Sequence, residues 1–222
     1  MAVALIVAAG RGERLGSRGP KALVTLAGRP MLEWSIAALR TVAAVQRIVI
    51  ALPDGVDIDV GHGVIAVVGG VTRSQSVREA LRASGDGDPV IVHDAARPLA
   101  SPELFERALD ELELTGADAA IAATPVSDTI KQVADDGHTV DRTLDRKRLW
   151  AVQTPQVFRR AVLERVLGEA SDELLAVATD DAWLIERAGG IVHLVRSDSH
   201  NVKVTSPIDL ELAELMLAER AR

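Results

Sequence analysis

The chain has 222 residues, a length typical of one α/β domain, and its 48% hydrophobic content excludes a disordered chain. It contains no cysteine, which excludes disulfide frameworks, thiol catalysis and cysteine–zinc sites. The net charge of −7 argues against a nucleic-acid polymer as the main partner, because proteins that bind nucleic acids usually present basic surfaces.

The first predicted element is a buried strand over about residues 4–9, which runs directly into a glycine-rich loop. Glycines stand at positions 10, 12, 16 and 19 and cations at 11, 14, 18 and 21. Glycines let backbone N–H groups approach an anion, and Arg14 and Lys21 can add charge. The loop therefore predicts a phosphate site, with a flexible surface loop as the other interpretation. It lacks the Walker A spacing and the third glycine and distant acid of a dinucleotide fingerprint.

Helices and strands alternate through the next hundred residues. Helices are predicted over 30–42, 72–81 and 101–114, and strands over 47–52, 64–68, 89–93 and 117–123. This alternation predicts a mostly parallel, twisted sheet with helices on both faces. Ligands of such sheets bind beyond the carboxyl ends of the strands, so the first loop, Gly69-Gly70 and residues 93–98 should meet at one edge.

The alternation stops at residues 125–150. Short strands are predicted over 129–133 and 139–144, joined by an Asp-Gly turn. This β-hairpin is polar and basic and has too few apolar residues to form its own core. We expect an arm that packs on a second subunit, with a solvated flap as the alternative.

The last third of the chain returns to helices and a strand. Helices are predicted over 159–167 and from 179–181 to Gly189-Gly190, and a strand over 191–195. Ser206 and Asp209 form a capping-box pattern for the final helix. The apolar residues expected to face the core from that helix are Ile208, Leu212, Leu215 and Met216. Without repeats or a linker, residues 1–222 are interpreted as one domain.

Seven segments in register resemble one family of enzymes. They are residues 8–21, Gly69-Gly70 with Arg73 and Ser76, Val92–Pro98, Asp128–Lys131, Thr154–Gln156, Thr179–Asp181 and Asn201–Thr205. In this order they resemble the 2-C-methyl-D-erythritol 4-phosphate cytidylyltransferases of the non-mevalonate isoprenoid pathway, over about residues 3–217. The resemblance implies a GT-A-like, Rossmann-like nucleotidyltransferase fold with the hairpin as a dimerisation arm.

The resemblance also implies a reaction. CMP would pass from CTP to 2-C-methyl-D-erythritol 4-phosphate, giving 4-diphosphocytidyl-2-C-methyl-D-erythritol and pyrophosphate. Mg²⁺ is the expected cofactor, with no protein ligands assigned to it, and the expected assembly is a homodimer through the 125–150 arm. Because no apolar run reaches 18 residues and the N-terminus has no leader pattern, we expect no membrane partner and a cytoplasmic location.

Site roles carried over from the resemblance fall into three groups. The residues expected to act in catalysis are Arg14, Lys21, Arg146 and Lys203. The residues expected to bind the nucleotide are Ala8, Ala9, Gly10, Gly12, Lys21, Gly70 and Ser76. The residues expected to hold the acceptor are Asp94, Arg97, Thr129, Arg146, Thr154 and Lys203, with Thr129 and Arg146 reaching the partner's site.

Other interpretations of these residues stay open. Asp94 could be a turn residue, Arg97 could brace the loop by pairing with Asp94, and Arg146 could be a solvated charge. His93 is expected to be a core histidine, and Asp180 and Asp181 to be helix-start acids. The alternative functions are a sister transferase acting on ribitol phosphate or a molybdopterin, a non-catalytic nucleotide-binding module of the same fold, and, less favoured, a dinucleotide-dependent oxidoreductase.

Overall fold

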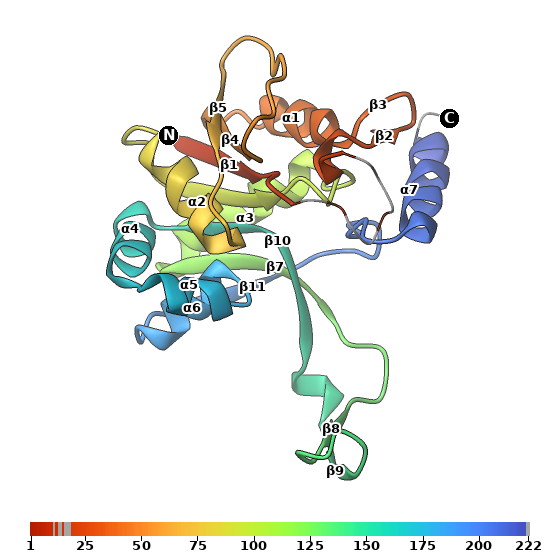
Figure 1. Ribbon diagram of the computed structural model, residues 1–222. Coiled ribbons are helices and arrows are strands. Elements are labelled where there is room, and N and C mark those ends of the chain that lie inside the picture. The colour runs from red at the N-terminus through yellow and green to blue at the C-terminus, as the bar shows by residue number, and fades with distance from the viewer. Residues whose placement is uncertain (11, 13–14, 16–18, 221–222) are drawn as a thin grey trace.

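The computed structural model describes residues 1–10, 12, 15 and 19–220. Its centre is a seven-stranded sheet in the order β11-β7-β10-β6-β1-β4-β5 (Figure 1). The strands are β1 (Ala2–Val7), β4 (Val45–Leu52), β5 (Val64–Val68), β6 (Val90–Asp94), β7 (Ala119–Pro125), β10 (Trp150–Phe158) and β11 (Val192–Arg196). All pairs are parallel except those of β10, which confirms the predicted mostly parallel sheet.

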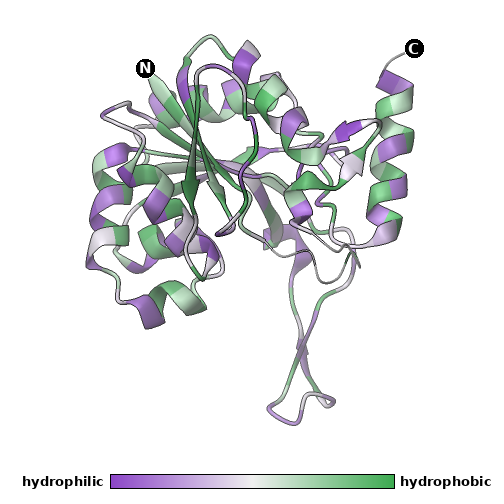
Figure 2. Cartoon of the chain, turned by 45° about the horizontal axis from the view of Figure 1, so that its top comes forward, coloured by the Kyte–Doolittle hydropathy of each residue, from purple (hydrophilic) through white to green (hydrophobic). Residues whose placement is uncertain are grey.

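Helices cover both faces of this sheet, as the alternation predicts. One face carries α1 (Met31–Thr41) and α3 (Pro102–Thr115). The other carries α2 (Arg73–Arg82), α4 (Arg160–Glu169), α5 (Asp172–Val177) and α6 (Asp181–Arg187). Successive residues of β1 point to opposite faces: Ala4 and Ile6 pack under α1 and α3, whereas Val3 and Leu5 pack under α2 and α4. Both faces of β1 are therefore buried, and Figure 2 shows the resulting apolar centre.

One central strand was not predicted. The sequence predicts no element for residues 150–156, yet they begin β10, which lies between β6 and β7. Pro155 has no backbone N–H to donate to a sheet, so its presence argues against a central strand. The structure accommodates it with a bulge: the pairing of β10 with β7 shifts between Val152 and Gln156.

The order of strands defines where a ligand can enter. The chain leaves β1 toward β4 and β5 on one side and then returns to β6 on the other side of β1. This reversal beside β1 is the switch point at which open α/β sheets form a crevice. The segments after β1 and β6 flank it, and the N–H of Ala95 donates to the Val7 carbonyl across it (3.1 Å).

The predicted β-hairpin is confirmed as β8 (Lys131–Val133) and β9 (Val140–Thr143). The turn has Gly137 at φ 73°, and the Asp136 carboxylate accepts from two backbone N–H groups after it. A short 3₁₀ turn, η3 (Arg146–Arg148), leads back to β10. Figure 1 shows the hairpin projecting well away from the sheet.

The final helix α7 (Pro207–Arg220) begins with the predicted capping box, in which Ser206 and Asp209 exchange hydrogen bonds. Its predicted core face is wrong. Ile208, Leu212 and Leu215 are exposed, whereas Ala213 and Leu217 are buried against the short strand β2 (Thr25–Leu26) and its neighbours. β2 forms a small hairpin with β3 (Arg29–Pro30).

The error has a physical reason. The helix has two stripes of apolar residues, both at helical spacing, and packing selects the one that includes the small Ala213. Of the four residues predicted to face the core, Met216 alone packs against this cluster, and it is only partly buried. Within the described residues no helix is both long enough and apolar enough to cross a membrane.

Candidate active site

The glycine-rich loop and its cations begin at the carboxyl end of β1. Ala8 is buried, Ala9 is half-buried and Gly10 is exposed. The chain then returns to this point, because the N–H of Lys21 donates to the carbonyl of Gly10 (3.2 Å) at the start of the 3₁₀ turn η2 (Lys21–Leu23). Lys21 is thus placed beside the end of β1. Gly12 has φ 74°, a left-handed conformation that favours glycine. Arg14 lies outside the described residues.

The segment after β5 closes the same edge from the other side. Thr72 and Gln75 form a capping box that starts α2, and Ser76 Oγ donates to the carbonyls of Thr72 (2.9 Å) and Gly70 (3.3 Å). A Cβ atom on Gly70 would lie 2.3 Å from Cβ of Gln75, so only glycine fits this approach. Gly70 and Ser76 are therefore brought together, as the sequence predicts.

Asp94, the last residue of β6, is the centre of a charged cluster. Its Oδ2 accepts from Nζ of Lys203 (2.7 Å) and its Oδ1 from Nε of Arg73 (3.0 Å). Its backbone N–H donates to Oγ1 of Thr154 (3.0 Å), which the bulge in β10 presents to it. Three predicted acceptor residues, Asp94, Thr154 and Lys203, thus meet at the switch point.

Arg73 and Asp181 complete this cluster, and the sequence reasoning assigned neither a role. Nη1 of Arg73 donates to Oδ2 of Asp181 (2.5 Å), whose side chain is fully buried at the start of α6. The sequence signal for Arg73 was its position as the first residue of α2, directly after the Gly-Gly segment. The prediction for Asp181 as a helix-start acid holds, but it overlooked this ion pair.

Burial and charge oppose each other in this cluster. Burial alone would raise the pKa of the Asp94 carboxyl, but Arg73 and then Lys203 outweigh it, so its pKa lies below the ordinary value. Burial would lower the pKa of the Arg73 guanidinium, and Asp181 and Asp94 raise it instead. For Asp181 burial dominates, and its pKa is raised. Asp94 and Arg73 are therefore held in their charged forms.

His93 and Arg97 brace the loop after β6. His93 is fully buried, and its ring contacts Phe105 edge-on at 5.0 Å. Its Nδ1 lies 3.1 Å from Oγ1 of Thr154 and its Nε2 lies 3.2 Å from the Arg97 carbonyl. This agrees with the predicted core histidine. Arg97 is also buried, and Nη1 donates to the carbonyl of Asn201 (2.7 Å). Within the described residues, Asp94 pairs with Lys203 and Arg73, not with Arg97.

A cavity of about 900 Å³ lies beside this cluster, toward the base of the arm. Arg97 and Lys203 line it, together with polar residues that the sequence did not single out, among them Gln153, Ser127 and Asp198. The lining also includes Arg107 and Arg196, whose contact runs from Nη2 of Arg107 to the Arg196 carbonyl (3.3 Å). Such a mixture of cations, neutral donors and the acids Asp198 and Asp209 suits a phosphate on a hydroxylated carbon chain, because the cations can bind the phosphate and the acids can accept from hydroxyl groups.

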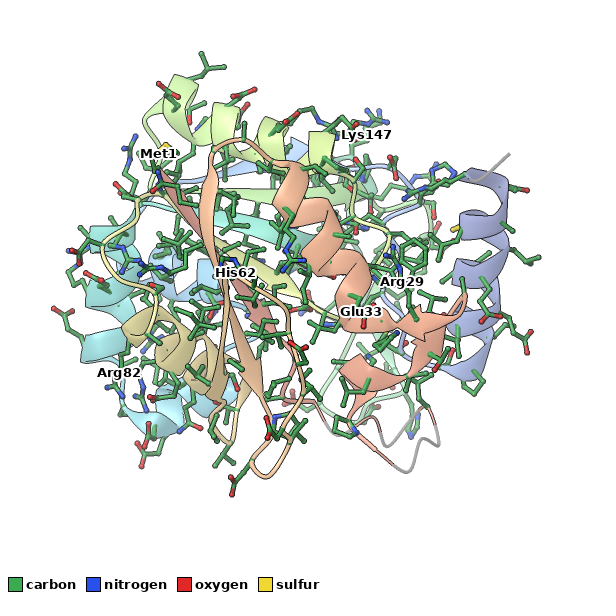
Figure 3. The ribbon with its side chains drawn as sticks, turned by 90° about the horizontal axis from the view of Figure 1, so that it is seen from above. Met1, Arg29, Glu33, His62, Arg82 and Lys147 are labelled. Carbon is green, nitrogen blue, oxygen red and sulfur yellow. The ribbon has the colours of Figure 1, made fainter. Side chains whose placement is uncertain are left out.

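A smaller cavity of about 330 Å³ lies elsewhere, between α1 and residues 58–61. Arg29 and Glu33 line it near the start of α1, as Figure 3 shows. It contains none of the predicted site residues.

Two predicted acceptor residues are not part of the cluster within the one chain. Thr129 and Arg146 lie on the projecting arm, and Nη1 of Arg146 donates to the carbonyl of Ser127 (2.5 Å). Both are exposed. Their place in a site therefore depends on a second chain, and their roles stay predictions.

Comparison with known proteins agrees with this geometry. A family model described as 2-C-methyl-D-erythritol 4-phosphate cytidylyltransferase matches residues 2–219. A protein of that name from Deinococcus radiodurans is 47% identical over 96% of this chain and 88% of its own length. Another from Rubrobacter xylanophilus is 44% identical over 100% of this chain and 96% of its own length.

A solved structure gives the same result for the fold. The crystal structure of 2-C-methyl-D-erythritol 4-phosphate cytidylyltransferase from Thermus thermophilus has a TM-score of 0.82 and 35% identity, covering 98% of this chain and 100% of that one. The family match spans nearly the whole sequence, and it includes every segment that forms the cluster around Asp94. The chain therefore belongs to the 2-C-methyl-D-erythritol 4-phosphate cytidylyltransferase family.

Proposed function

We propose that this chain transfers CMP from CTP to 2-C-methyl-D-erythritol 4-phosphate, releasing pyrophosphate. The observation that carries the proposal is the meeting of Asp94, Thr154 and Lys203 at the switch point, beside the turn that holds Lys21. A phosphate-binding loop alone would serve any nucleotide-binding protein. The cluster around Asp94 would add a place for an acceptor next to the nucleotide.

The nucleotide half would lie between the ends of β1 and β5. Ala8, Ala9 and Gly10 on one side and Gly70 and Ser76 on the other would line the base and ribose, largely through backbone groups. Gly12, Lys21 and Arg14 would face the triphosphate. The glycines let backbone N–H groups approach the phosphates, and the cations oppose the charge that builds up in the transition state.

The reaction needs little covalent work from the protein. An oxygen of the acceptor phosphate attacks the α-phosphorus of CTP in line. The new P–O bond forms as the bond from the α-phosphorus to the oxygen bridging to the β-phosphorus breaks, and pyrophosphate leaves. Because two anions must approach each other, catalysis depends on positioning and on cations such as Lys21 and Lys203.

The acceptor half would be the cavity beside Asp94. Lys203 and Arg97 line it, and so does Gln153, the neighbour of the Thr154 that accepts from the N–H of Asp94. Lys203 would bind the acceptor phosphate, while the Asp94 carboxylate keeps free lone pairs that can accept from hydroxyl groups. This division gives each end of a polyol phosphate a partner of matching chemistry.

We also propose Mg²⁺ as a cofactor that arrives with the nucleotide. The described residues hold no group of three or more His, Cys, Asp or Glu side chains that could bind a metal ion, and both Asp94 oxygens already face cations. They do not make a magnesium site by themselves, so the nucleotide phosphates would supply most ligands. The ion would neutralise phosphate charge; loss of turnover with EDTA, restored by added Mg²⁺, tests this.

The direct test mixes the purified protein with CTP, Mg²⁺ and methylerythritol phosphate and follows pyrophosphate release. Parallel reactions replace the acceptor with ribitol phosphate or omit it. We expect release only with methylerythritol phosphate. Release with ribitol phosphate alone would move the chain to a sister activity, and CTP binding without any release would make it a non-catalytic module.

A variant pair tests the residues behind the activity. Lys203→Met should lower kcat/KM for the acceptor by about 100-fold, the scale of losing one charged transition-state contact. Arg82→Met is the matched control, because Arg82, labelled in Figure 3, pairs with Glu79 on the surface of α2 (2.9 Å) and is not one of the proposed site residues. Equal activity of the two variants would remove Lys203 from the mechanism.

We further propose that two chains form a homodimer through the 125–150 arm, with Thr129 and Arg146 completing the partner's site. The arm exposes Val133 and Val140, which a partner would cover. We propose in addition that each chain forms one domain and that the protein is cytoplasmic. A mass near that of one chain by light scattering would refute the dimer.

Complementation tests whether the arm crosses. Arg146→Met and Lys203→Met chains are made separately and then co-refolded. If Arg146 acts on the partner, each mixed dimer has one intact site, so activity should return to about a quarter of the unmodified level, since about half of the dimers are mixed. No recovery would mean that each arm serves its own chain.

A further inference from the structure

Each oxygen of the Asp94 carboxylate is held by one cation. Lys203 approaches Oδ2 at 2.7 Å and Arg73 approaches Oδ1 at 3.0 Å, while the Asp94 backbone N–H is bound to Thr154. A carboxylate shared by two cations can be drawn toward either of them. The balance between Arg73 and Lys203 therefore decides where the Lys203 ammonium lies.

Arg73 is itself held by a second carboxylate. Its side chain is only 24% exposed, and it donates through Nε to Asp94 and through Nη1 to Asp181. It is also the first residue of α2, where the helix dipole disfavours a cation. Two carboxylates offset that cost and hold the guanidinium between β6 and α6.

Asp181 is not required to cap its own helix. Asp180 does this, because its Oδ1 accepts from the N–H of Trp183 (2.8 Å). Asp181 is fully buried, and its Oδ1 has no hydrogen-bond partner within the described residues. Burying a carboxylate with one oxygen unsatisfied is unfavourable, and packing alone would be served better by an apolar side chain. A buried acid in this state points to a role in arranging Arg73.

We infer that Asp181 is a positioning residue of the acceptor site: it holds one end of the Arg73 guanidinium, restricts Arg73 to Oδ1 of Asp94 and so leaves Oδ2 to Lys203. Without Asp181, the guanidinium turns to bind both Asp94 oxygens in the bidentate geometry that arginine favours with a carboxylate. Lys203 then loses its anchor at the site. The inference rests on the proposed function, which assigns Asp94 and Lys203 to the acceptor.

The test compares steady-state kinetics of the unmodified protein with Asp181→Asn, which keeps the shape and removes the charge. KM for methylerythritol phosphate should rise about tenfold, equivalent to about 1.4 kcal/mol, while KM for CTP stays within about twofold. A loss of folded protein would lower kcat alone and leave both KM values unchanged. The matched control is Asp172→Asn, which removes an exposed acid that pairs with Arg78 of the same helix α2 (3.0 Å) and should leave both KM values unchanged.

A second variant keeps the test decisive if Asp181→Asn folds poorly. Arg73→Lys retains a cation but lacks the forked guanidinium that could bind both Asp94 oxygens, so it should leave Oδ2 to Lys203 and keep KM for the acceptor within about twofold. The acceptor KM of the double variant should not exceed that of the more impaired single variant, because both substitutions break the same connection between Arg73 and Asp181.

These results would overturn the inference: an unchanged acceptor KM in Asp181→Asn, an equal rise in both KM values, a tenfold rise of the acceptor KM in Arg73→Lys, or effects that multiply in the double variant. Turnover by the unmodified protein separates the two proposals. If it is absent, the proposed function fails and the inference with it; if it is present, these results concern the inference alone.

Discussion

His93 offers a stability prediction whose magnitude follows from its surroundings. Its Nδ1 faces the Thr154 hydroxyl, which already accepts from the N–H of Asp94, so the hydroxyl hydrogen points to Nδ1. The ring hydrogen is therefore on Nε2 and donates to the Arg97 carbonyl. Protonation would add a hydrogen to Nδ1, so that Nδ1 and the Thr154 hydroxyl would both be donors facing each other. The neutral ring is the form that this environment satisfies.

Burial lowers the pKa of His93 to about 4 from an ordinary 6.5, with the nearby Arg97 and Arg73 charges in the same direction and Asp94 opposing. The unfolded chain thus takes up the proton at a higher pH than the native protein does. Stability from His93 is complete above about pH 6.5 and is lost as the pH falls toward about 4. Between pH 7.5 and 4.5 this linkage lowers the free energy of unfolding by about 2.5 kcal/mol.

The measurement compares the unmodified protein with His93→Gln, which keeps a donor toward the Arg97 carbonyl and cannot titrate. Urea unfolding at several pH values, followed by tryptophan fluorescence, gives the free energy of unfolding of each. Their difference should shrink by about 2.5 kcal/mol between pH 7.5 and 4.5, because only the unmodified protein loses the His93 contribution. His138→Gln on the exposed hairpin controls for removal of a histidine. A pH-independent difference would refute the tautomer and the burial argument together.

Three further predictions concern the loop, the nucleotide side and the last helix. Lys21→Met should lower kcat by at least about 100-fold; retained kcat would remove its transition-state role. Gly70→Ala should destabilise the protein by about 1–3 kcal/mol and raise KM for CTP, since the new Cβ meets Gln75; unchanged stability and KM would contradict the close approach. Asp209→Asn should lose about 1 kcal/mol at pH 7 by urea unfolding. Hydrogen bonds from Thr205 and Ser206 lower the pKa of Asp209 to about 2, so this loss should diminish as the pH falls from about 4 toward 2, and a constant loss would argue against the charged cap.

Local sequence patterns predicted the elements that are determined by residues close together in the chain. The helix start at Thr72, the capping box at Ser206 and the Asp-Gly turn at Gly137 all occur where they were predicted, because each depends on partners three or four residues away. The parallel sheet followed from alternation for the same reason. These features require no knowledge of what lies across the fold.

Contacts between distant segments limited the rest. Pro155 argues against a strand when the sequence is considered alone. The bulge around it acquires its role only from the position of β10 between β6 and β7, which no local pattern indicates. That bulge delivers Thr154 to the N–H of Asp94, 60 residues away in the sequence. The residue that obscured the strand therefore belongs to the feature that builds the site.

The Arg73 bridge shows the same limit for charges. Arg73 and Asp181 are 108 residues apart, and Asp181 has an ordinary helix-start interpretation by itself. Together with Asp94 and Lys203 they form a cluster of two cations and two anions, so its formal charge is zero. A neutral cluster can be buried at a modest free-energy cost, but it exerts little attraction on a triphosphate.

The attraction must then come from cations outside that cluster. The loop of residues 11–21 carries four cations against one acid, and residues 142–148 of the arm carry another four against one. These two segments would flank the neutral cluster if the arm of a second chain reaches it. In that arrangement the flanking cations draw in the two anionic substrates, and the neutral cluster orients the acceptor without holding its phosphate too tightly to react. Under the proposed dimer, this division would let an acidic protein bring two polyanions together, because its positive charge would be concentrated beside the phosphates while the cluster around Asp94 is balanced.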